Sequence, residues 1–157
     1  VVFGKGENGN FTRLYWAIRG HKFVYPGRKD TIKACIYVKE LVRFMLYRLE
    51  NHEHGVELYN CCFEPAYTIQ HIVEAMKKVT GLTQFVPDIP NWVIMPMARM
   101  AMLLGSPMGI CPARVKKLQI STNICGAKLK NSGYQFKWSF EEALADWFED
   151  NDRKYLK

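Results

Sequence analysis

The spacing of apolar residues changes repeatedly along the first half of the chain, and this alternation constrains the fold more than any other feature. Short β-branched or aromatic runs at 1–3, 34–38 and 56–60 predict strands. Between these runs, apolar residues recur three and four positions apart, a spacing that places them on one side of a helix. The second half is mostly helical by the same criterion. The alternation predicts an α/β or mixed domain of helices and short strands.

Several of the predicted helices also have recognisable ends. The last helix is the clearest, because Ser139 and Glu142 have the S-x-x-E spacing of a capping box. Asn10 precedes the first helix and Gly20 follows it, while Thr68 and Gly81 bracket the third. The apolar positions are Phe11, Leu14, Tyr15 and Ile18 in the first helix, Leu41, Val42, Met45, Leu46 and Leu49 in the second, Ile69, Ile72, Val73 and Met76 in the third, and Phe140, Ala143, Leu144, Trp147 and Phe148 in the last.

Two further helices are predicted between the third and the last. One is an apolar helix over 91–104, in which Pro96 predicts either a late start or a kink. The other is a basic helix over 113–120. Phe23 to Tyr25 and 34–38, between the first and second helices, and 56–60, between the second and third, supply the brief strands that complete the alternation.

Length and composition indicate one folded domain. At 157 residues, with 48% apolar and 24% charged residues, the chain can bury a core of ordinary size. The most apolar stretch, 92–105, contains Arg99 and is too short for a membrane span, so a soluble protein without a membrane partner is expected. The 5 cysteines include no C-x-x-C pair, so neither a disulfide framework nor a metal site is expected, and a cytoplasmic location is predicted. Because the chain starts inside a predicted strand and without Met, we expect a portion of a longer protein.

The net charge of +7 restricts the partners. The basic excess is concentrated in residues 1–50 and 101–157, whereas 51–100 is slightly acidic. Such a distribution suits a nucleic acid, an anionic surface or a phosphorylated small substrate, and it also suits a solvated basic face. The sequence contains no recognisable nucleic-acid motif, so no nucleic-acid partner is expected.

Three motifs have the spacing of known functional sites, but the residues around them do not support those functions. Gly4, Gly6 and Gly9 spell G-x-G-x-x-G, but a dinucleotide-binding turn needs a complete buried strand before it, and only three residues precede this one. The Y-x-x-x-K spacing of Tyr25 and Lys29 needs a helix, which Pro-Gly after the tyrosine disfavours. His52-Glu53-His54 lacks further metal ligands. No complete catalytic constellation is present, so no catalytic residue is assigned.

Anion binding remains as a candidate chemistry. Asn10 stands at a helix start, where unsatisfied backbone N–H groups attract phosphate. Lys33 precedes a strand, and Arg114 opens a basic helix. These residues predict either a diphosphate pocket, if they converge, or separate surface cations.

Five segments in this order resemble the C-terminal half of extended short-chain dehydrogenase/reductases, the NAD-dependent epimerase/dehydratase family. They are VVFGKGENGN, FVYPGRKDTIKACIYVKELVRFML, GVELYNCC, TIQHIVEAMKKVTG and LKNSGYQFKWSFEEALADW. The resemblance implies the C-terminal substrate-binding part of an extended Rossmann-type α/β fold, with 1–157 as one portion and 1–4 and 56–60 as strands of the cofactor-domain sheet. The cofactor-binding turn and the catalytic Tyr/Lys pair would then lie outside this sequence.

The resemblance also implies a function. The intact enzyme would transfer hydride to and from NAD or NADP while acting on a nucleotide sugar. It would form a homodimer, and this chain alone would be inactive. Val1 and Val2 would lie at the cofactor. The implied substrate-binding residues are Asn10, Phe23, Tyr25, Lys33 and Arg114.

Departures from the family pattern keep two alternatives open. Lys33 replaces the usual arginine, Lys5 the usual proline, and Cys125-Gly126 the usual aspartate. A lysine lacks the bidentate fork that suits diphosphate, and the apolar Val1 and Val2 leave room for a less polar, sterol-like substrate. A stand-alone basic binding module without catalysis is the alternative of a different class.

Overall fold

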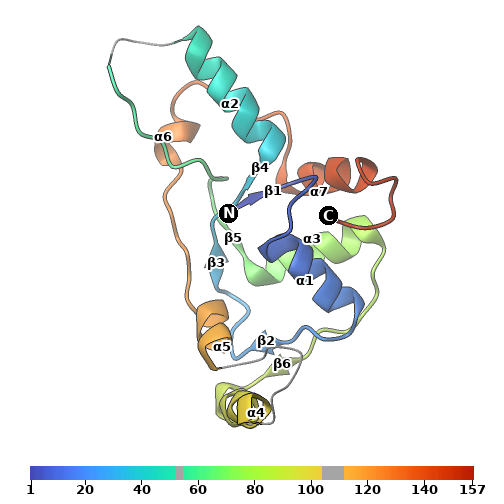
Figure 1. Ribbon diagram of the computed structural model, residues 1–157. Helices are drawn as coiled ribbons and strands as arrows, with labels where there is room; N and C mark the ends of the chain where they lie inside the picture. The colour runs from blue at the N-terminus through green and yellow to red at the C-terminus, as the bar shows by residue number, and fades with distance from the viewer. Residues whose placement is uncertain (52–54, 104–111) are drawn as a thin grey trace.

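The computed structural model describes residues 1–51, 55–103 and 112–157, apart from the side chain of Arg114. Helices α2 and α4 lie at opposite ends of the molecule, and α1, α3 and α7 gather between them (Figure 1). The helices are α1 (Asn10–Arg19), α2 (Val38–Glu50), α3 (Ile69–Thr80), α4 (Asn91–Leu103), α5 (Pro112–Gln119), α6 (Ala127–Lys130) and α7 (Phe140–Glu149). The strands are β1 (Val2–Phe3), β2 (Tyr25–Pro26), β3 (Ile32–Lys33), β4 (Ile36–Tyr37), β5 (Tyr67–Thr68) and β6 (Asp88–Ile89).

The short strands join segments that are distant in the sequence. β1 pairs in parallel with β4, β2 pairs in parallel with β6, and β3 pairs antiparallel with β5. In the pair that holds the start of the chain, Val2 lies opposite Ile36. The predicted class, mixed helices and short strands, is confirmed.

Residues 56–60 do not form a strand in this chain. Val56 and Leu58 are 103% and 82% exposed, and the segment pairs with no strand among the described residues. An extended segment needs a neighbouring strand to satisfy its backbone groups. That 56–60 joins a sheet of a cofactor domain therefore stays a prediction.

The main core lies between α1, α3 and α7 and is rich in aromatic rings. Phe3 stacks on Phe11 at a centroid distance of 4.7 Å and meets Phe140 edge-on at 5.6 Å. Trp147 from α7 is fully buried in the same cluster. These contacts attach β1 to α1, which follows it directly, and to α7 near the end of the chain.

Three of the predicted helices are confirmed, α3 and α7 with their predicted caps, whereas α1 has Gly9 and not the predicted Asn10 at its cap position. α3 begins where the Thr68 hydroxyl accepts the His71 N–H at 3.2 Å, and it ends at Gly81, whose φ of +69° is left-handed. α7 has the complete capping box, with Ser139 N–H donating to Glu142 at 2.8 Å. α1 runs from Asn10 and ends before Gly20.

The basic helix predicted over 113–120 is confirmed as α5, whereas the expectations for α2 and α4 require corrections. The predicted apolar side of α2 faces outward, and the buried residues of this helix are Glu40 and Phe44. Four residues of the apolar side are at least half exposed: Val42, Met45, Leu46 and Leu49. α4 begins at Asn91, so of the two outcomes expected at Pro96 the late start does not occur. Pro96 lies inside the helix, where it removes the backbone bond that would reach Trp92 O. Among the residues that the structure describes, no helix is long and apolar enough to cross a bilayer.

Candidate functional site

The first glycines form a turn that leads from β1 into α1. Gly4 has φ +144°, and a Cβ there would lie 2.4 Å from Val38 Cγ1, so only glycine fits. Gly6 has φ +84° and faces open space. After this turn, the Glu7 carboxylate accepts the Thr12 N–H at 2.9 Å, and the Thr12 hydroxyl donates to the Glu7 carbonyl. A carboxylate of the chain therefore already occupies the positive start of α1, where a pyrophosphate would otherwise bind.

Asn10 is exposed at the first position of α1. It lies within the turn that the Glu7 carboxylate caps, so a phosphate bound at Asn10 would have a negative neighbour. The phosphate-binding role of Asn10 stays a prediction.

Phe23 and Tyr25 are core residues. They are 9% and 5% exposed, and their rings meet edge-on at 5.6 Å. Burial raises the pKa of Tyr25 to about 12, with Glu74 and Asp88 adding to the effect, so the phenol stays neutral. In the backbone of this segment, Tyr25 N–H donates to Pro87 O at 2.9 Å, and a substrate-binding role of Phe23 and Tyr25 stays a prediction.

Lys29 does not form a proton relay with Tyr25. Its ammonium lies 5.5 Å from the centre of the tyrosine ring and pairs with Asp88 at 3.5 Å. The expectation that this Y-x-x-x-K spacing is only a turn agrees with the left-handed φ of +74° at Gly27.

Lys33 connects β3 to the end of α5. Its ammonium donates to Ile120 O at 2.6 Å and to Lys117 O at 3.3 Å. A cation beside the last carbonyls of a helix is favourable, because these carbonyls carry partial negative charge. Burial, and secondarily the neighbouring Lys117, lower the pKa of Lys33. No local pattern predicts this contact, since it joins residues more than eighty positions apart.

The structure brings several predicted site residues to one region. Gln119, in the last turn of α5, donates to Pro26 O at 3.0 Å and to the Asn91 side-chain oxygen at 2.9 Å. The backbone of β2, Lys33 and α5 are thereby held next to one another. Arg114 belongs to α5, but its side chain lies outside the described part of the structure. His52, Glu53 and His54 also lie outside the described residues.

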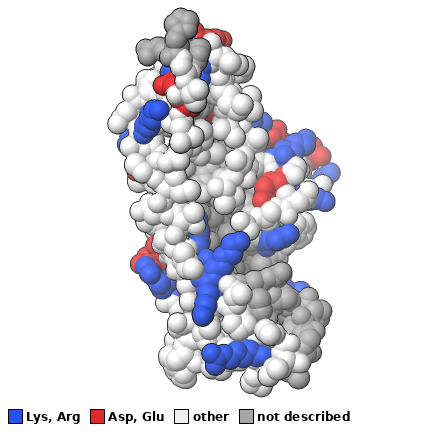
Figure 2. Space-filling model, turned by 60° about the vertical axis from the view of Figure 1, so that its left-hand side comes forward, with Lys and Arg blue, Asp and Glu red and all other residues white. Residues whose placement is uncertain are grey.

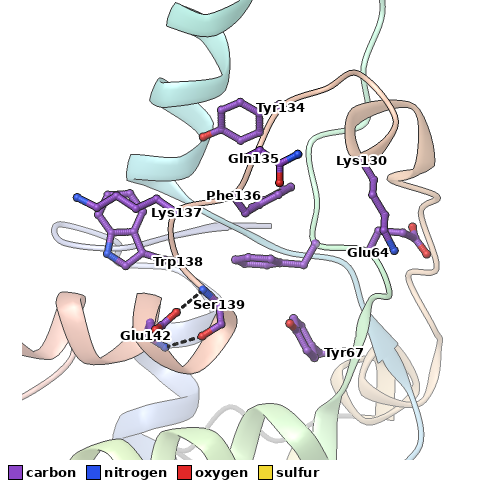
Figure 3. A pocket seen from close by; sticks show the side chains of 11 residues that line it. Glu64, Tyr67, Lys130, Tyr134, Gln135, Phe136, Lys137, Trp138, Ser139 and Glu142 are labelled. Carbon is purple, nitrogen blue, oxygen red and sulfur yellow. Dashed lines mark hydrogen bonds between the residues drawn. The ribbon is translucent and has the colours of Figure 1, made fainter.

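A hollow of about 550 Å³ opens elsewhere, between the residues after 60 and the segment before α7 (Figure 3). The sequence did not indicate it. Both acidic groups in its wall serve the fold, because Glu64 accepts the Gly126 N–H at 2.8 Å and Glu142 caps α7. The lining residues are Phe63, Glu64, Tyr67, Lys130, Tyr134, Gln135, Phe136, Lys137, Trp138, Ser139 and Glu142.

The buried carboxylate of Glu40 holds the segment 134–138, which lines this hollow. Glu40 is fully buried and accepts bonds from Lys137 N–H at 2.5 Å, Trp138 N–H at 2.8 Å and the Tyr134 hydroxyl. Burial, and then the bond to Glu40, raise the pKa of Tyr134 to about 12, which keeps this phenol a donor. The arrangement satisfies a buried charge and holds the chain in place.

The described residues bring together no group of three or more His, Cys, Asp or Glu side chains that could hold a metal ion. They also show no nucleophile, base and orienting acid in contact. That Lys33 and Arg114 bind an anion near α5 stays a prediction.

Known proteins resemble this chain over nearly its whole length. No family model matches the chain. Over 150 residues the chain is 25% identical to the N-acetyl-alpha-D-glucosaminyl-diphospho-ditrans,octacis-undecaprenol 4-epimerase of Escherichia coli O157:H7, covering 92% of this chain and 45% of that protein. The structure of the human epimerase family protein SDR39U1, solved with NADPH, aligns with a TM-score of 0.67 at 20% identity, over 96% of this chain and 46% of the other. The expected resemblance to the epimerase/dehydratase family is confirmed.

A second solved structure gives the same result. UDP-N-acetylglucosamine 4-epimerase from Bacillus cereus aligns with a TM-score of 0.60 at 13% identity, over 92% of this chain and 41% of that one. The likeness to these structures shows a shared fold. The chain spans about half the length of the curated relative and of the solved structures that it matches.

Proposed function

We propose that this chain is the substrate-binding portion of an NAD(P)-dependent epimerase, dehydratase or reductase that acts on a nucleotide sugar. The observation that carries the proposal is the similarity to a curated epimerase across 92% of the chain. The names of that relative and of the Bacillus cereus enzyme both describe a sugar joined to a diphosphate. The common chemical element is the diphosphate, so a site for two phosphates is the part to look for in this chain.

The region between β3 and α5 is the proposed diphosphate site. The Lys33 ammonium has three donors, of which two bind carbonyls of the α5 end, so one can still reach a phosphate. α5 adds Arg114, Lys116 and Lys117 on a short helix. Several cations that converge on one anion bind it far better than one does.

The cofactor fits this chain only at its edge. Val1 and Val2 are 49% and 43% exposed and offer apolar contact alone. The glycine turn after β1 does not fit a pyrophosphate, since Glu7 already binds the first turn of α1. We therefore assign binding and positioning of the substrate to this chain, and hydride transfer to a cofactor held mainly by another portion of the intact enzyme.

An exposed apolar surface supports contact with such a portion. Met45 and Leu49 on α2 are 57% and 76% exposed, and Val56 and Leu58 are more exposed still. The two segments lie together, because Arg48 of α2 pairs with Glu57. Apolar surface of this kind is normally covered by a partner. In this proposal 1–4 and 56–60 continue the sheet of the cofactor-binding portion.

Isothermal titration with UDP-N-acetylglucosamine tests the diphosphate site. Lys33→Ala and Arg114→Ala should each weaken binding by about tenfold or more, because each removes a charged hydrogen bond to phosphate. Lys78→Ala, which removes the same charge from an exposed position on α3, is the matched control. Circular dichroism of each variant shows whether it is folded.

This titration, together with one against heparin, separates the alternatives. If both variants bind like the unmodified chain, the site is wrong. If the chain binds heparin but no UDP-sugar, the stand-alone basic binding module is favoured instead.

A further inference from the structure

One long stretch of the chain holds basic residues and no acidic ones. Residues 89–140 contain no Asp or Glu, whereas the rest of the chain holds basic and acidic residues in equal number. The whole net charge of +7 therefore belongs to this stretch. Its basic residues are Arg99, Arg114, Lys116, Lys117, Lys128, Lys130 and Lys137.

The same stretch contains a helix that is apolar on nearly all sides. In α4 only Ile94 and Ala98 are buried, against Val115 of α5. A helix with so little polar surface is normally enclosed by protein or lipid. Yet large apolar side chains of α4 are exposed: Trp92 at 79%, Met97 at 55%, Met100 at 62%, Met102 at 63% and Leu103 at 84%.

The apolar helix and the cations are neighbours. α4 packs on α5, and the exposed Lys116 and Lys117 belong to α5. α4 forms one end of the molecule in Figure 1, and the same end shows white and blue atoms but no red in Figure 2. We call this the α4–α5 surface. It consists of the exposed side chains of Trp92, Met97, Arg99, Met100, Met102, Leu103, Lys116 and Lys117.

We propose that the α4–α5 surface binds a bilayer that contains anionic phospholipids, with α4 lying in the interface. Exposed Trp, Met and Leu side chains enter the boundary between headgroups and acyl chains, where tryptophan is favoured. Lys116, Lys117 and Arg99 then meet the anionic headgroups. This is contact with one leaflet and needs no membrane-spanning helix. It goes beyond the proposed enzymatic role.

A second copy of the chain is a poorer occupant of this surface. Two α4–α5 surfaces facing each other would bring together two sets of cations with no acidic residue from 89–140 to offset them. An anionic surface supplies the missing negative charge. Charge complementarity therefore selects the lipid surface.

Vesicle co-sedimentation of the whole chain tests the proposal. The chain should sediment with vesicles of phosphatidylcholine mixed with phosphatidylglycerol, but not with phosphatidylcholine alone, and added salt should weaken binding. Lys116→Ala combined with Lys117→Ala should lower the partition coefficient about 30-fold. The control, Lys77→Ala combined with Lys78→Ala on α3, should leave it unchanged.

The apolar contribution has its own pair of variants. Met100→Ser with Leu103→Ser on α4 should reduce binding by about tenfold or more. Leu46→Ser with Leu49→Ser on α2, at the opposite end of the molecule, should not. Tryptophan emission should shift to shorter wavelength on anionic vesicles, and this shift should be lost in Trp92→Phe.

Three results would overturn the proposal. The first is absence of binding to anionic vesicles by the folded chain. The second is equal loss of binding in the α2 and α4 variants. The third is self-association of the chain, measured by sedimentation velocity, without any vesicle binding. In that case Met100→Ser with Leu103→Ser would convert the oligomer to monomer.

Discussion

Helices α7 and α4 are both rich in apolar residues but have opposite surroundings. In α7, Phe140, Ala143, Leu144 and Trp147 are all fully buried. In α4, a longer helix, only Ile94 and Ala98 are buried. The helices differ in where their apolar residues stand, since α7 confines them to one side and α4 spreads them around the axis. A confined stripe finds one partner within the domain, whereas a helix that is apolar all round leaves surface for something else.

The ends of the two helices show the same contrast. α7 starts at a capping box whose two residues bind each other's backbone. The first residue of α4, Asn91, instead uses its side-chain oxygen to accept a bond from Gln119 of α5. α7 is thus specified by its own sequence, while α4 depends on a neighbouring helix for its position.

Removing a tryptophan from each helix gives the largest test of this comparison. Trp147→Ala should lower the free energy of unfolding by about 3–5 kcal/mol, because it empties a fully buried site and removes the bond from its indole N–H to Lys157 O. Trp92→Ala should change it by less than about 0.5 kcal/mol, since that ring is 79% exposed. Urea denaturation followed by circular dichroism measures both.

Trp147→Phe keeps most of the buried volume and provides a folded comparison if Trp147→Ala fails to fold. Similar losses from Trp92→Ala and Trp147→Ala would mean that α4 is as firmly enclosed as α7.

A glycine directly after Phe3, the residue of β1 that packs on α7, gives the next effect. Gly4→Ala should cost about 2–3 kcal/mol, because the new Cβ would lie 2.4 Å from Val38 Cγ1 and the residue has φ +144°. Gly6→Ala has a strained φ of +84° but open space, so its cost should be about 1 kcal/mol. Thermal unfolding of the two variants separates packing from backbone strain, and equal costs would contradict the close contact with Val38.

Local signals predicted the helices whose partners lie within this domain. The stripe and caps of α3 and α7 follow from residues four or fewer positions apart, which is the range that periodicity and capping can detect. For α2 the same method found the apolar side but not what it faces. Glu40, which is fully buried instead, owes its place to backbone N–H groups nearly a hundred residues away.

The candidate site was predictable as a list of cations but not as an arrangement. Lys33 was identified as a phosphate ligand, yet two of its donors bind the end of α5. Phe23 and Tyr25 were placed at a ligand, and their side chains are in the core. Each difference depends on contacts between distant segments, and a sequence read in short windows does not contain them.

The cap of α7 gives a smaller expected effect. Ser139→Ala should cost about 1 kcal/mol, because the Glu142 N–H loses its partner at the helix start. Asn91→Ala at the start of α4 should cost less, since the lost bond comes from the Gln119 side chain and leaves no backbone N–H of α4 without its partner. Urea denaturation decides, and a larger cost at Asn91 would show that α4 is the more tightly specified helix.

The polar side of α7 supplies the last test, through its dependence on pH. Asp146 accepts bonds from the Lys39 ammonium at 2.6 Å and the Tyr37 hydroxyl at 2.5 Å, and Asp150 binds the same ammonium at 2.7 Å. Burial opposes ionisation, but the bonds from Lys39 and Tyr37 hold the pKa of Asp146 below its usual value. The charged form is therefore favoured by folding.

The sign of the pH effect follows from this lowered pKa. The stabilisation is fully present above the unfolded-state pKa of about 3.9, and it is lost as the pH falls through the lower folded-state value. Asp146→Asn should cost about 1 kcal/mol at neutral pH, the scale of a partly exposed ion pair, and this cost should shrink toward zero under acid conditions. Asp152→Asn, with a side chain 84% exposed, should show no such convergence. Unfolding measured across this acid range checks both, and a cost of Asp146→Asn that stays constant with pH would mean that its carboxylate does not stabilise α7 through its charge.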